Sequence, residues 1–157
     1  MILFNLSVLA RPAETLVLRQ PDPDGRRLWK ALFEQTTGRI CLVINEPYDR
    51  GSIEHWCKVE GFKPSFYEIL DEPVITLRAE KIHRISSTFG RPEWYIDNDP
   101  RLCAETLKLG IPTLVVACPY IVRPEWDGER VVKEWSQLVD SMDAQALKSA
   151  ERTWGDI

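Results

Sequence analysis

The sequence lacks several features that would assign it to a specialised class of proteins. No apolar run reaches 18 residues, so we expect no helix that spans a bilayer. The first apolar segment is not preceded by basic residues and is interrupted by Asn5 and Ser7, which argues against a secretory signal. Lysine and arginine total 20 against 24 acidic residues, a net charge of −4. This balance argues against a general binder of nucleic acids or membrane surfaces.

Residues typical of metal centres and redox sites are also scarce. Cysteine occurs four times, at positions 41, 57, 103 and 118, with no C-x-x-C pair and no zinc-ligand spacing. We therefore expect reduced, structural thiols in a cytoplasmic protein. The two histidines, His55 and His83, fall on predicted helices, where a surface or hydrogen-bonded position is more typical than a metal or acid–base role.

Apolar segments in the chain alternate between strand-like and helix-like patterns. The predicted strands are 2–8, 15–18, 40–44, 66–70, 74–77, 94–97 and 112–117, and the predicted helices are 26–36, 50–60, 79–89, 101–109 and 129–151. Such alternation is typical of βαβ units and predicts one α/β domain over 1–157, with three layers and a mainly parallel sheet. Trp29 and Trp56 fall on amphipathic helices, so we expect them in the core.

Two acids, Asp97 and Asp99, follow the predicted strand 94–97 directly. In an open α/β sheet, ligands bind beyond the carboxyl ends of the strands, so these carboxylates are candidate site residues. Because Asp-x-Asp-Pro precedes a predicted helix, the simpler alternative is that both acids only cap that helix. The first strand has no acid at the equivalent place, where Asn5 and Ser7 stand instead.

A second acidic pair, Asp22 and Asp24 in Asp-Pro-Asp-Gly, offers a rival interpretation. The pair could be a displaced acidic motif after a strand. Pro21 interrupts that strand, however, and the tetrapeptide is typical of a turn before a helix. We therefore interpret it as a turn.

These motifs resemble those of the haloacid dehalogenase (HAD) superfamily of phosphohydrolases over residues 1–117. The similarity is greatest to small capless members, such as the phosphatase domain of phage polynucleotide kinases. His55-Trp56, on the helix after the second main strand, and Phe62-Lys63, at the end of that helix, contribute to the resemblance. It implies a HAD-like, Rossmann-type sheet.

The resemblance assigns a role to each site position. Asn5 stands in place of the nucleophilic aspartate, and Ser7 in place of the acid–base aspartate. Asn45 stands in place of the phosphate-binding Thr or Ser, and Lys81, with Lys63 as the alternative, corresponds to the phosphate-binding lysine. Asp97 and Asp99 match the metal-holding motif. All six positions, Asn5, Ser7, Asn45, Lys81, Asp97 and Asp99, are therefore expected in one cleft.

The first motif is degenerate, because an amide and a hydroxyl replace the two acids that the phosphatase reaction needs. We expect a pseudoenzyme that acts by binding, as a regulatory or phage accessory protein. The alternative is an active phosphohydrolase on a nucleotide or nucleic-acid phosphate end, with an atypical first motif. No cofactor is expected. Asp97 and Asp99 could hold Mg²⁺ only weakly, through water, and without it a nearby Lys81 would partly neutralise them.

The resemblance ends near residue 117, and the extension 118–157 is rich in aromatic residues. These are Tyr120, Trp126, Trp135 and Trp154. Aromatic anchors are typical of protein interfaces, which predicts that this extension contacts another protein. Self-association is left open, and the rival expectation is that these side chains complete the core.

Overall fold

The computed structural model describes residues 1–10, 19–90, 93–117, 139–140, 143–144 and 147. The chain divides into two compact units, Met1–Val116 and Ala117–Ile157. Nearly all described residues belong to the first unit. The predicted strand 15–18, Cys118 and most of the predicted helix 129–151 lie outside the described residues.

The first unit is an α/β structure built on five parallel strands. Its elements are β1 (Ile2–Asn5), α1 (Leu6–Leu9), α2 (Pro23–Gln35), β2 (Ile40–Ile44), α3 (Arg50–Glu60), β3 (Phe66–Ile69), α4 (Ile75–Thr88), β4 (Tyr95–Asp97), α5 (Pro100–Lys108) and β5 (Thr113–Val115). The strand order is β3-β2-β1-β4-β5, and every pairing is parallel. The predicted α/β class with a parallel sheet is confirmed.

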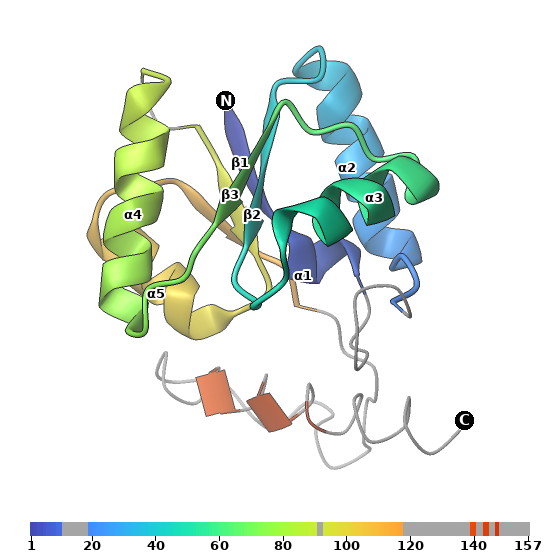
Figure 1. Cartoon of the computed structure of the whole chain (residues 1–157). Helices are drawn as coiled ribbons and strands as arrows, with labels where there is room; N and C mark the ends of the chain where they lie inside the picture. The colour runs from blue at the N-terminus through green and yellow to red at the C-terminus, as the bar shows by residue number, and fades with distance from the viewer. Residues whose placement is uncertain (11–18, 91–92, 118–138, 141–142, 145–146, 148–157) are drawn as a thin grey trace, which may run out of the picture. The chain divides into compact units, whose positions relative to one another are not determined.

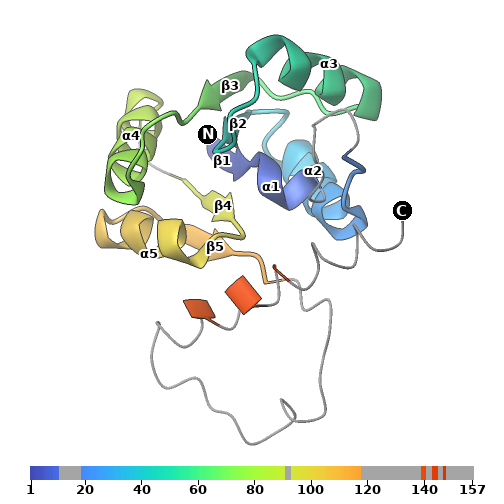
Figure 2. The same cartoon turned by 60° about the horizontal axis from the view of Figure 1, so that its bottom comes forward.

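Helices cover both faces of this sheet, so the unit has three layers. Figures 1 and 2 show α2 and α3 on one side and α4 and α5 on the other. Because successive strand residues face opposite sides of a sheet, β1 contributes to two cores. Phe4 packs in the cluster that holds Trp29 and Trp56, whereas Leu3 packs in the cluster that holds Tyr95. Both tryptophans are only 4% exposed, which confirms that they belong to the core.

Several element boundaries match the predicted ones. Strand β2 and helix α3 have the predicted limits, and α3 ends at Gly61, whose φ of 82° is the left-handed conformation that glycine adopts without strain. The described cysteines, Cys41, Cys57 and Cys103, are buried and free, as predicted. Within the described part of the chain, no helix is long and apolar enough to span a bilayer.

Two predicted strands are wrong in whole or in part. The first strand ends at Asn5 rather than at residue 8, because the Asn5 side chain accepts the N–H of Ser7 and starts the short helix α1. Residues 75–77 belong to α4 instead of a strand. Ile75 packs in the same core cluster as Ala79 and Ile82, so the helical spacing extends back beyond the predicted start at residue 79.

The Asp-Pro-Asp-Gly segment starts a helix, as predicted. The side chain of Asp22 accepts the N–H of Gly25 at 2.9 Å, and Pro23 occupies the first turn of α2, three residues before the predicted helix start. Gly25 is required by packing, since a Cβ atom there would lie 1.9 Å from the carbonyl oxygen of Val8. The rival interpretation, a displaced acidic motif at the end of a strand, is wrong.

Candidate functional site

The sheet order places a topological switch point between β1 and β4. The chain continues from β1 to β2 on one side, and later returns to add β4 on the other side. Ligands of open α/β sheets bind at such a point, beyond the carboxyl ends of the strands. Asn5 is the last residue of β1 and Asp97 the last of β4, and their side chains approach to 3.4 Å. The two residues therefore share one edge of the sheet, as predicted.

The Asn5 side chain connects three parts of this edge. It is 1% exposed. Its Oδ1 accepts the backbone N–H of Ser7 at 3.0 Å, which caps α1. Its Nδ2 donates to the hydroxyl of Tyr95 at 3.2 Å and lies 3.4 Å from Oδ2 of Asp97. The amide thus acts as an acceptor on one side and as a donor on the other.

The Asp97 carboxylate is fully buried and surrounded by donors. Its Oδ1 accepts the backbone N–H groups of Asn98, at 2.7 Å, and of Asp99, at 3.1 Å. Its Oδ2 accepts the hydroxyl of Tyr95 at 2.5 Å. Burial raises the pKa of Asp97 to about 7, against the lowering effect of the hydrogen bonds from Tyr95 and from the two N–H groups. Burial and the Asp97 charge also raise the pKa of Tyr95 well above its ordinary value.

Ser7 and Asn98 bond to each other and join helix α1 to the residue after Asp97. The Ser7 hydroxyl lies 2.6 Å from Oδ1 of Asn98, 2.8 Å from Oδ1 of Asn5 and 3.3 Å from Oδ1 of Asp97, and its one proton serves one of these acceptors at a time. Nδ2 of Asn98 donates back to the carbonyl of Ser7 at 3.2 Å. We call Asn5, Ser7, Tyr95, Asp97 and Asn98 the carboxyl-edge network.

Asp99 lies beside this network but has a different role. Its side chain accepts the N–H of Arg101 at 3.0 Å and caps α5, with Pro100 in the first turn. The capping alternative is therefore confirmed for Asp99. The capping alternative is wrong for Asp97, whose carboxylate accepts the N–H groups of Asn98 and Asp99, which precede the helix, and the hydroxyl of Tyr95.

The remaining predicted site residues have other partners. The carbonyl of Asn45 accepts a hydrogen bond from Arg78 at 3.2 Å, one strand away from the network. The ammonium of Lys81 donates to the carbonyl of Ile69 at 2.8 Å and lies 3.4 Å from Glu72. The expectation that Lys81 neutralises Asp97 is therefore wrong, since its charge is paired at the end of β3. Lys63, the alternative lysine, is exposed.

Sequence reasoning missed two members of the network, Tyr95 and Asn98. A signal for Tyr95 was present, because a residue two positions before Asp97 on a strand faces the same side of the sheet. The role of Asn98 depends on α1, which the strand prediction did not include. The geometry of the Ser7 and Asn98 pair could not be found without that helix.

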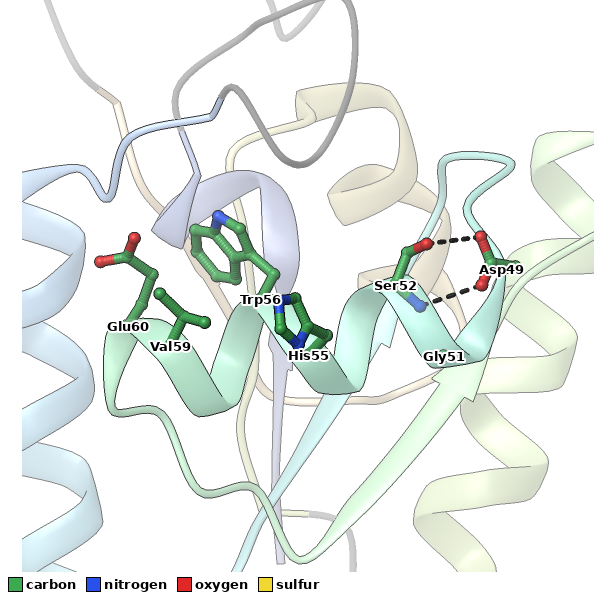
Figure 3. Close-up of a pocket in the computed structure, with 7 residues that line it drawn as sticks. All are labelled: Asp49, Gly51, Ser52, His55, Trp56, Val59 and Glu60. Carbon is green, nitrogen blue, oxygen red and sulfur yellow. Dashed lines mark hydrogen bonds between the residues drawn. The ribbon is translucent and has the colours of Figure 1, made fainter.

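A separate hollow of about 360 Å³ lies along α3. Figure 3 shows its seven lining residues, which all come from α3 or its N-cap, Asp49. Ser52 donates to Asp49 through its N–H at 2.9 Å and its hydroxyl at 2.6 Å, and these bonds lower the pKa of Asp49. His55 lines this hollow, far along the chain from the network. Because the Ser52 hydroxyl is bonded to the capping acid, the hollow presents no activated nucleophile.

Comparisons with known proteins do not identify the chain. Its sequence matches no model of a known protein family, and no curated protein is significantly similar to it.

Proposed function

We propose that this protein is a catalytically degenerate, HAD-like protein that acts by binding. The five-stranded parallel sheet and the position of Asp97 at the end of β4 support the HAD-like assignment. The proposed loss of catalysis rests on the identity of residue 5. Asn5 is a buried amide at the carboxyl end of the central strand β1, where the resembled family has its nucleophilic aspartate.

The chemistry of this amide explains the proposal. An aspartyl nucleophile must be a carboxylate, and an amide nitrogen or oxygen is a poor attacking group at phosphorus. Asn5 is also engaged at both ends, by Ser7 and by Tyr95. Ser7, in place of the acid–base residue, cannot protonate a leaving group as a carboxylic acid does.

A phosphatase assay tests the loss of catalysis. We expect no turnover of p-nitrophenyl phosphate or of a 3′-phosphorylated oligonucleotide with Mg²⁺ present. Asp97→Asn serves as the matched control, because it changes the only network carboxylate. Magnesium-dependent turnover that Asp97→Asn abolishes would show instead an active phosphohydrolase with an atypical first motif.

We further propose that the extension from residue 118 onward supplies the binding function by contacting another protein. Tyr120, Trp126, Trp135 and Trp154 lie outside the described residues, so their sequence pattern alone supports this step. Tryptophan and tyrosine are enriched at the energetic centres of protein interfaces. Acrylamide quenching of the wild type and of Trp126→Phe and Trp154→Phe variants tests it. Loss of a readily quenched component in either variant supports an exposed anchor, and no loss in both contradicts it.

A further inference from the structure

The carboxyl-edge network can be compared with the requirements of a magnesium site. Mg²⁺ takes oxygen ligands in a near-octahedral arrangement and needs lone pairs directed at the ion. Around Asp97, the protein directs hydrogen atoms instead. Oδ1 receives two backbone N–H groups, and Oδ2 receives the Tyr95 hydroxyl.

The neighbouring oxygens show the same pattern. Oδ1 of Asn5 accepts the N–H of Ser7, and Oδ1 of Asp99 accepts the N–H of Arg101. The nitrogen Nδ2 of Asn5, which cannot bind a cation, is the atom that points toward Asp97. The residues present therefore do not fit the cation that the resembled family holds at this position.

A relay of hydrogen bonds lies where the resembled family has an interaction between a cation and carboxylates. Nδ2 of Asn5 donates to the hydroxyl of Tyr95, and that hydroxyl donates to Asp97. Linked bonds of this kind polarise and strengthen one another in a buried setting. They connect the β1–α1 junction to the end of β4, two segments about 90 residues apart in the sequence.

We infer that the carboxyl-edge network is a metal-independent clamp: the Tyr95 hydroxyl and two backbone N–H groups bond to Asp97, and Asn5 bonds to Tyr95, so that no divalent cation is needed to hold β1 to β4. This inference rests on the proposed function, because it explains how the degenerate site remains stable. The amide of Asn5 is then a required part of the fold, not a neutral remnant of a lost acid.

Melting temperatures of the full chain in millimolar Mg²⁺ and in EDTA test the clamp. We expect equal values for the wild type in both. The double variant Asn5→Asp with Ser7→Asp should have a lower melting temperature than the wild type in EDTA. Mg²⁺ should restore part of this loss, because the two added carboxylates repel Asp97 and supply oxygen ligands for the cation. The matched control Asn45→Asp, one strand away, should show no Mg²⁺ dependence.

Two results would overturn the clamp. One is a saturable rise in the wild-type melting temperature with Mg²⁺ that Asp97→Asn removes. The other is an unchanged melting temperature of the double variant in EDTA. If the double variant does not fold, Tyr95→Phe provides the test, since it breaks the relay without adding charge. Its melting temperature should fall equally in Mg²⁺ and EDTA, and an unchanged value would contradict the clamp.

These measurements separate the clamp from the proposed loss of catalysis. Wild-type stabilisation by Mg²⁺ without phosphatase turnover would contradict only the clamp. Turnover in a protein whose melting temperature is insensitive to Mg²⁺ would contradict only the proposed function.

Discussion

The single substitution Asn5→Asp perturbs the carboxyl-edge network most precisely. It keeps the size and shape of the side chain and leaves the acceptor that caps α1. It replaces the Nδ2 donor with an oxygen 3.2 Å from the Tyr95 hydroxyl and 3.4 Å from Oδ2 of Asp97. The relay loses its first hydrogen bond, and two carboxylates face each other in a site closed to solvent.

The structure sets the size of the effect. Two unit charges 3.4 Å apart repel by about 5 kcal/mol at an effective dielectric constant of about 20. Keeping one carboxyl protonated at pH 7 costs about 4 kcal/mol if its ordinary pKa is about 3.9. The pKa of Asp97, about 7, reduces this cost, because that group already holds a proton part of the time. With about 1 kcal/mol for the lost hydrogen bond, we expect Asn5→Asp to lower the free energy of unfolding by about 2–4 kcal/mol at pH 7.

Urea denaturation of the wild type and the variant at about pH 4 and pH 7 measures this effect. The loss should shrink to about 1 kcal/mol near pH 4, because protonating a carboxyl group costs little when the pH is close to its ordinary pKa of about 3.9. The control Asn45→Asp makes the same chemical change one strand away, where the Arg78 guanidinium bonds to the backbone carbonyl of residue 45 and no second carboxylate belongs to the network, and its loss should be smaller than that of Asn5→Asp. An Asn5→Asp loss that is small, independent of pH, or equal to that of the control would contradict this prediction.

Further predictions concern the pH dependence of stability and the core. The Asp97 pKa rises from 3.8 in the unfolded chain to about 7 in the folded chain, so the folded chain binds more protons between these two pH values. The contribution of Asp97 to the free energy of unfolding therefore falls as the pH rises from about 4 to 7. Urea titrations should show that Asp97→Asn removes this slope. Trp29→Ala should lower the free energy of unfolding by about 3–5 kcal/mol, measured the same way, since Trp29 is 4% exposed. Gly25→Ala should cost about 1–3 kcal/mol because its Cβ would meet the Val8 carbonyl, whereas Gly51→Ala, with no backbone atom so close, should be tolerated in thermal melts.

The sheet and its central helices could be predicted because their patterns are local. The apolar run Ile40–Ile44 is typical of a strand buried on both faces, and the stripe of Ile53, Trp56 and Cys57 marks α3. The predicted strand at residues 74–77 failed because β-branched residues favour strands locally. In the folded chain, packing of Ile75 with Ala79 and Ile82 decides for a helix.

The position of the candidate site could be predicted from the sequence, but the hydrogen-bond partners of its side chains could not. The shared edge of Asn5 and Asp97 follows from parallel strands and needs no side-chain geometry. The partners of Lys81 could not be predicted, because they depend on how the turn after β3 brings Glu72 to the α4 surface. The direction of the Asn5 amide, with its nitrogen toward Tyr95, depends on long-range contacts that no local pattern carries.

The hydrogen-bond partners of Asp97 all come from the protein, and we propose that no cation binds there. Anomalous diffraction from crystals grown or soaked in Mn²⁺, a close substitute for Mg²⁺ with oxygen ligands, tests this claim directly. We predict no manganese peak within coordination distance of the Asp97 carboxylate, with the bond from the Tyr95 hydroxyl intact. A manganese ion bound to Asp97, with the Asn5 amide or the Tyr95 hydroxyl displaced, would contradict the claim.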